Sequence, residues 1–190
     1  MQLGNTRGRY GLVTMLFHWV VALAVFAMYG LGLYLDSLSY YDPNYRLVPH
    51  WHKSIGILLA FVLVARLIWR FLSMAPAPMG HHSAVERGLA RWAHTSLYLL
   101  TMATIIVGYL ISTADGRSIE VFSWFRVPAL PLSIEKQEDI AGELHFWLAT
   151  ALVALASLHG AAALKHHFVD GDATLKRILP QFSKEAKKGD

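Results

Sequence analysis

Two histidines in one long apolar segment are the first residues of this sequence whose type and spacing suggest chemistry. His145 and His159 belong to a stretch, residues 144–164, that holds 21 residues without Asp, Glu, Lys or Arg. An α-helix turns by about 100° per residue, so a separation of about 14 residues brings the second side chain to within about 40° of the first. With a rise of about 1.5 Å per residue, the two rings lie about 21 Å apart along the axis. One helix would therefore present two imidazoles on one face, at two depths, which is the pattern of half a two-heme site.

The composition places these histidines in a membrane protein. Of 190 residues, 55% are hydrophobic and 16% are charged, whereas about 25% charged residues is usual in soluble domains. The absence of cysteine excludes disulfides, thiolate ligands, iron–sulfur clusters and covalently attached heme. The ten histidines are then the principal candidate ligands. The net charge of +4 is modest and lies at the ends of the apolar segments, so no nucleic-acid partner is expected.

Four charge-poor segments predict an all-α membrane protein, a four-helix transmembrane bundle. About 20 apolar residues cross the hydrocarbon core, and the expected spans form a single domain, 1–190: residues 11–35, 49–72, 92–113 and 144–167. Lys and Arg are enriched before the first span, between the second and third, and after the fourth. Because basic loops tend to stay in the cytoplasm, both termini are expected on the cytoplasmic side. The acidic loop between the last two spans is expected to hold only a short helix near residues 133–137.

This topology pairs the histidines by depth. His18 lies about as far into the first span from the cytoplasmic side as His159 lies from the same side of the fourth. His52 and His145 both lie near the start of spans that enter from the outside. Two bis-histidine sites result, and heme needs only two axial ligands, whereas structural zinc needs about four clustered ones. Arg66 follows His52 by the same 14-residue offset, on the same face, and so falls at the level of the inner site.

Several neighbouring residues are weaker candidates. Arg66 is expected to pair with a heme propionate, with snorkelling to the interface as the alternative. His94 and His166, at the cytoplasmic edge, either bind a propionate or quinone or are solvated. Lys53 and Arg46 lie near the outer site and could attract a small anion. The tryptophans beside the histidines either pack on porphyrin edges or are interface aromatics: Trp19, Trp51 and Trp147.

Four short motifs carry a resemblance to a known family. In chain order they are Phe17-His18-Trp19, His52-Lys53-Ser54-Ile55-Gly56, Leu144-His145-Phe146-Trp147 and the run from Leu158-His159-Gly160 to Lys165-His166-His167. Over residues 10–177 the chain resembles the bacterial cytochrome b561 family. The resemblance implies a multi-pass protein of the bacterial inner membrane with two non-covalent b-type hemes (heme b). It also implies axial ligands on the first, second and fourth helices, matching His18, His52, His145 and His159.

The same resemblance implies a function. Some members of the family pass electrons from periplasmic superoxide to membrane ubiquinone, and their quinone-side histidines correspond to His94 and His166. The family's basic loop position falls at His81, which is a departure. The expected activity is diheme electron transfer between the periplasmic side and quinone, as a superoxide:ubiquinone oxidoreductase. The alternatives are a non-catalytic electron carrier or membrane anchor for a periplasmic redox partner, and a small transporter. A transporter predicts broken helices, for which Gly30-Leu31-Gly32 is the one hint.

Overall fold

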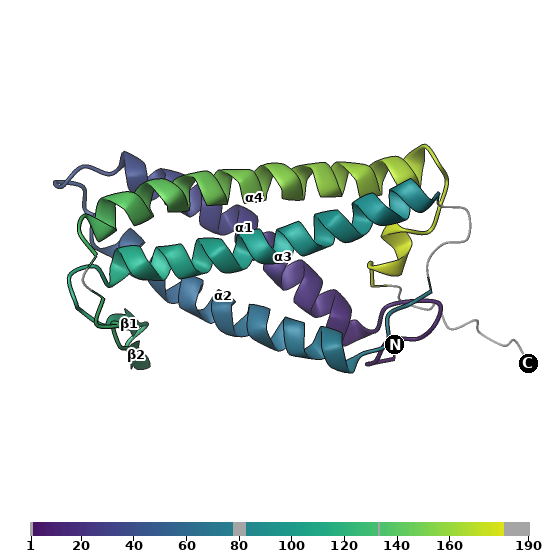
Figure 1. Ribbon diagram of the computed structural model, residues 1–190, viewed down its shortest axis with the longest axis horizontal. Helices are drawn as coiled ribbons and strands as arrows, with labels where there is room; N and C mark the ends of the chain where they lie inside the picture. Colours follow the sequence, from purple (N-terminus) through teal and green to yellow (C-terminus); the bar gives the residue numbers. More distant parts are fainter. Residues whose placement is uncertain (1, 78–82, 133, 181–190) are drawn as a thin grey trace, which may run out of the picture.

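Four long helices make up most of the molecule. The computed structural model describes residues 2–77, 83–132 and 134–180. The helices are α1 (Leu12–Ser37), α2 (Leu47–Leu72), α3 (Ala84–Ser112) and α4 (Gln137–Phe168), and they run side by side in a bundle (Figure 1). Each is long and apolar enough to cross a membrane. The prediction of an all-α, four-helix membrane protein is therefore confirmed.

Two helices begin earlier than the charge-free segments suggested. α3 begins at Ala84 because Ser83 and Glu86 form a capping box: Glu86 N donates to Ser83 Oγ at 3.2 Å, and Ser83 N donates to Glu86 Oε2 at 2.7 Å. α4 begins at Gln137, with two acidic residues in its first turn, where they interact favourably with the helix dipole. A prediction based on hydrophobicity alone misses the polar first turns of α3 and α4. His94 and His145 therefore lie well inside their helices.

The two ends of the bundle differ in what covers them. The start of α1, the end of α4 and the short 3₁₀ helix η1 (Leu175–Arg177) lie at one end, here called the η1 end (Figure 1). The strands β1 (Ile119–Val121) and β2 (Phe125–Val127) lie at the other, the hairpin end. α3 packs along α4, and α1 packs along α2.

The β-hairpin was missed by the sequence reasoning. β1 and β2 pair antiparallel, and their turn places Phe122 and Ser123 at positive φ, 45° and 64°. Tight hairpin turns are usually predicted from Asn-Gly or a similar pair, and this sequence has no such pair between the two strands. The hairpin docks on α2 through Ser54, which is fully buried and accepts a hydrogen bond from Phe122 N at 3.2 Å. Of the expected short helix, Ser133 lies outside the described residues, and Gln137 is already part of α4.

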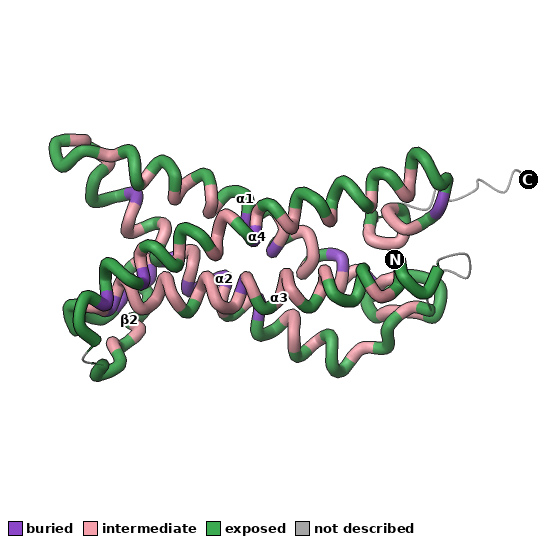
Figure 2. The backbone as a smooth tube through the Cα atoms, turned by 45° about the horizontal axis from the view of Figure 1, so that its top comes forward, coloured by how far each residue is buried: buried purple, intermediate pink, exposed green. Residues whose placement is uncertain are grey.

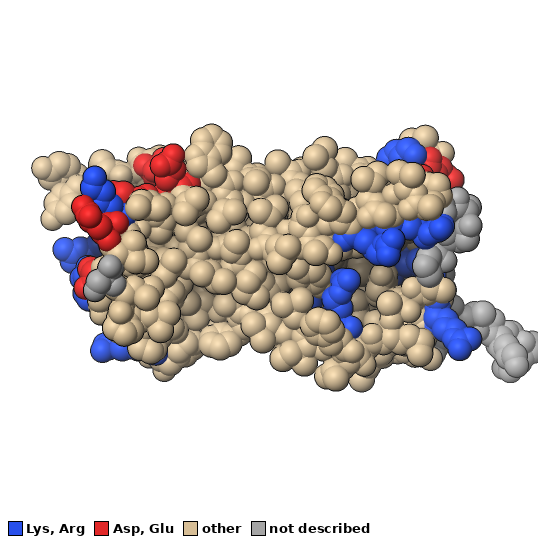
Figure 3. All heavy atoms as spheres, in the orientation of Figure 1, with Lys and Arg blue, Asp and Glu red and all other residues tan. Residues whose placement is uncertain are grey.

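The molecule is apolar on its outside. Buried residues, purple in Figure 2, are few and lie between the elements, whereas exposed positions follow the outer faces of the helices. On the face in Figure 3, charged side chains lie toward the two ends and the middle is free of them. A surface with exposed apolar side chains and backbone bonds satisfied inside helices is what contact with lipid requires.

Candidate functional site

The first candidate site lies at the hairpin end, where His52 of α2 faces His145 of α4. Their ring centroids are 6.1 Å apart and their planes are inclined by 72°. An imidazole nitrogen binds a metal at about 2 Å, so two rings that share one metal from opposite sides have centroids about 6 Å apart. The pair is therefore spaced as two axial ligands of one heme iron would be.

Glycines on the other two helices make room for these rings. A Cβ at Gly108 of α3 would lie 2.8 Å from Cε1 of His145, closer than any side chain could remain. A Cβ at Gly32 of α1 would lie 3.4 Å from Cε1 of His52. α1 continues without a break through this point, from Leu12 to Ser37. Gly32 thus lies next to a ligand ring, and the broken helix that a transporter predicts is not seen in α1.

The hydrogen bonds of the pair leave nitrogen atoms free for a metal. His145 Nδ1 lies 2.9 Å from the carbonyl oxygen of Thr104, which can only accept, so the proton is on Nδ1 and the Nε2 lone pair is available. His52 Nδ1 is buried and has no hydrogen-bond partner within the described part of the chain. Buried polar atoms are normally satisfied, so an orphaned one indicates a site for another group. These residues fit the axial ligation of a b-type heme.

The second candidate site lies toward the η1 end and draws one residue from each helix: His18, Arg66, His94 and His159. Arg66 Nη2 donates to His18 Nδ1 at 3.2 Å. The rings of His94 and His159 are in edge contact, with centroids 4.9 Å apart. His18 is close enough to both of those histidines for charges on the rings to interact. The structure thus brings together the two histidines paired by depth and adds His94, which sequence reasoning had put at the edge of the span.

Tyr98 and Arg70 complete this second site, and neither was singled out from the sequence. The Arg66 guanidinium carbon lies 5.0 Å from the Tyr98 ring centroid, and that of Arg70 lies 5.3 Å from it. Cations at these distances from an aromatic ring are stabilised by it. The signal was present as helical spacing: Tyr98 follows His94 by one turn, and Arg70 follows Arg66 by one turn.

The three tryptophans beside the histidines have different surroundings. Trp19 Nε1 donates to the carbonyl oxygen of Ile178 at 2.9 Å and so ties the tail to α1. Trp51 and Trp147 are 49% and 60% exposed, as interface aromatics are. Within the described residues, the ring partner of Trp51 is Phe122 of the hairpin.

The remaining candidates lie at the two ends. His166 Nδ1 lies 2.7 Å from an Asp170 carboxylate oxygen, at the C-terminal end of α4. Lys53 and Arg46 are exposed at the hairpin end, and Lys53 directly follows His52. His81, the position expected to be basic, lies outside the described residues.

Comparison with known proteins gives these sites a context. A family model described as prokaryotic cytochrome b561 matches residues 9–181. The chain is 51% identical to cytochrome b561 homolog 2 of Escherichia coli K12 over 185 residues, which cover 97% of this chain and 98% of the relative. It is 29% identical over 177 residues to the probable superoxide oxidase CybB of Yersinia pestis, covering 91% and 97%. It is 24% identical over 173 residues to cytochrome b561 homolog 1 of E. coli K12, covering 91% and 98%. The chain therefore belongs to the prokaryotic cytochrome b561 family, membrane-embedded electron-transfer proteins in which a b-type heme is implied.

Proposed function

We propose that this protein carries electrons across the bacterial inner membrane through two non-covalent b-type hemes, between the periplasmic side and membrane quinone. The observation that carries this proposal is the His52–His145 pair, with its centroid separation of 6.1 Å and the space left by Gly108. The cluster toward the other end supports a second heme, through the Arg66–His18 hydrogen bond and the His94–His159 ring contact. Two sites in opposite halves of one bundle form a path across the hydrocarbon.

The protein contributes ligands and their environment. His52 and His145 would hold one heme, and His18 and His159 the other; a bound heme supplies a reversible one-electron couple. Two imidazoles on one heme iron would leave no open coordination position, which would suit electron transfer rather than oxygen binding. Thr104 fixes the tautomer and orientation of His145 through its carbonyl oxygen, as outer hydrogen-bond partners of metal ligands do.

Arg66 has a defined role in this proposal. A guanidinium only donates, so its bond to His18 Nδ1 requires the proton of that ring to be on Nε2. Metal binding through Nε2 needs the opposite tautomer, in which Nδ1 carries the proton and Arg66 can no longer donate to it. We assign the released guanidinium to a heme carboxylate, together with the nearby Arg70.

The orientation follows from charge. With basic segments at the η1 end, that end lies in the cytoplasm and the hairpin end faces the periplasm. Lys53 and Arg46 are exposed beside the outer site, where they would attract an anion such as superoxide. In the balanced reaction, two superoxide anions each give up one electron and leave as dioxygen. One ubiquinone takes up the two electrons and two protons at the η1 end, where His94 and His166 are the candidate contacts.

A second candidate function is that of an electron carrier or membrane anchor for a periplasmic redox partner. The observation that favours it is the identity of 51% with a relative named only as a cytochrome, against 29% with one named a probable superoxide oxidase. Purified protein in vesicles that contain ubiquinone separates the two functions. Quinone reduction with superoxide as sole donor supports the oxidoreductase. Hemes that superoxide leaves oxidised, but that a periplasmic protein reduces, support the carrier.

A further inference from the structure

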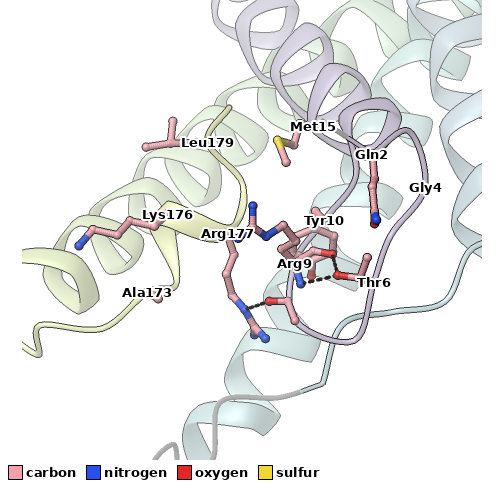
Figure 4. Close-up of a pocket in the computed structure, with 11 residues that line it drawn as sticks. Gln2, Gly4, Thr6, Arg9, Tyr10, Met15, Ala173, Lys176, Arg177 and Leu179 are labelled. Atoms are coloured by element: carbon pink, nitrogen blue, oxygen red, sulfur yellow. Dashed lines mark hydrogen bonds between the residues drawn. The ribbon is translucent and has the colours of Figure 1, made fainter. Parts of the chain in front are cut away.

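A cavity at the η1 end belongs to neither candidate heme site. Its volume is about 730 Å³, within the range of about 300–1,000 Å³ typical of ligand pockets. It opens between the N-terminal segment, residues 2–11, and the segment around η1 (Figure 4). The two walls come from opposite ends of the chain, so the fold itself builds the cavity.

Both walls are fixed by hydrogen bonds. Asn5 Oδ1 accepts from Gly11 N at 2.8 Å and from Thr14 Oγ1 at 2.7 Å, which folds the N-terminal segment back onto the start of α1. A Cβ at Gly11 would overlap the carbonyl of Gly4, so this close approach requires glycine. On the other wall, Arg177 Nε donates to the carbonyl oxygen of Gly8 at 2.9 Å.

The lining is cationic. Arg9, Lys176 and Arg177 line the cavity, and its described lining contains no carboxylate. Arg177 donates through Nε and Nη1, the latter to the carbonyl oxygen of Ala77 at 2.9 Å, so its planar group is held in one orientation with N–H donors to spare. Figure 4 shows the Arg9 side chain extending toward η1, beside Arg177. The cavity therefore offers guanidinium donors from the N-terminal segment and from η1, with which an anion can form charge-assisted hydrogen bonds.

The rest of the lining points to the kind of anion. Thr6 and Tyr10 add hydroxyl groups, and the buried Met15 and the exposed Leu179 add apolar surface. Met15 lies in the first turn of α1, at the depth where a membrane-spanning helix leaves the hydrocarbon. Basic pockets at the ends of membrane helices are suited to anionic lipid headgroups. We infer that this cavity binds a phosphate group, that of an anionic glycerophospholipid or of a free phosphate anion.

The test uses the heme-loaded protein in detergent and follows its thermal unfolding midpoint as dioctanoyl phosphatidylglycerol is added. A ligand that binds the folded state raises the midpoint in a saturable way. In the double variant Arg9→Gln/Lys176→Gln the apparent Kd is expected to weaken by about tenfold or more, because charge-assisted bonds are lost. Arg91→Gln removes a cation that does not line the cavity and should stay within about twofold of wild type. Arg9→Lys, which keeps the charge, should bind more tightly than the double variant.

Two further ligands separate the sources of the phosphate. Dioctanoyl phosphatidylcholine has the same chains without net charge and should bind more weakly than phosphatidylglycerol. If inorganic phosphate gives a midpoint shift as large as the lipid does, the ligand is the free anion; a smaller shift identifies the lipid headgroup. Equal responses of wild type and double variant to phosphatidylglycerol and to phosphate would overturn the inference. So would equal responses to phosphatidylglycerol and phosphatidylcholine.

Discussion

Replacing Gly108 by alanine tests the hairpin-end site through a single methyl group. The new Cβ would lie 2.8 Å from Cε1 of His145, whereas carbon atoms in contact prefer about 3.5–4.0 Å. The His145 ring is also held by its hydrogen bond to the Thr104 carbonyl oxygen. If the ring moves aside, that bond is lost, at a net cost of about 0.5–1.5 kcal/mol. Overpacking of this kind typically costs about 1–3 kcal/mol. Heme affinity at this site should fall by roughly tenfold to a hundredfold.

The assay is heme content per chain by pyridine hemochrome, combined with a redox titration that resolves two components. In Gly108→Ala we expect loss or weakening of one component, while the other keeps its potential. The matched controls are Gly32→Ala, whose Cβ would lie at an ordinary 3.4 Å from His52, and Gly30→Ala, whose Cβ would meet no atom within 4 Å. Gly32→Ala should have a small effect and Gly30→Ala none. Wild-type heme content and potentials in Gly108→Ala would refute the reasoning.

Three further predictions concern charge. Arg66→Gln should lower the potential of the η1-end heme, because it removes a cation that stabilises the reduced form. At an assumed separation of about 8 Å and an effective dielectric of about 20, such a charge is worth roughly 2 kcal/mol, or about 90 mV. A potential equal to that of Arg66→Lys would argue against the assigned role. Lys53→Glu should slow reduction by superoxide and weaken its salt dependence, as measured by stopped flow, whereas Arg91→Glu at the other end should not. Lys165 and then His166 hold the pKa of the Asp170 carboxyl below its ordinary value of 3.8. The ionised Asp170 carboxylate therefore stabilises the folded state above pH 3.8, and this stabilisation is lost as the pH falls through the lower pKa of the folded state. Thermal midpoints of wild type and Asp170→Asn should differ at pH 7 and converge at low pH, and a difference independent of pH would contradict the ion pairs.

Helical periodicity predicted most of what positions the candidate site. The spans followed from charge-free runs, and the levels of the histidines followed from the constant rise of a helix. The structure places His52 beside His145, as expected from their similar depth in the membrane. The assignment of these residues as heme ligands stays a proposal.

Most of the features that the sequence analysis missed depend on contacts between distant segments. Gly108 matters because a ring of α4 lies against it, and only the packing of α3 on α4 reveals this. The earlier start of α3 is different, because its capping box is a local signal of Ser83 and Glu86 that a search for charge-free segments does not detect. The hairpin relies on a turn in which Phe122 and Ser123 take positive φ without a glycine, held by the buried Ser54 of α2. For Gly108 and for the hairpin, tertiary contact overrides the local pattern.

The heme content of histidine variants tests the two-site arrangement most directly. We predict two hemes per chain in wild type and one in each single alanine variant. His52→Ala and His145→Ala should retain the same heme, identified by its potential, and His18→Ala and His159→Ala should retain the other. His94→Ala should keep both hemes, since its ring is a neighbour and not a ligand. A wild-type protein with one heme or none, or a different grouping of the variants, would contradict the paired sites.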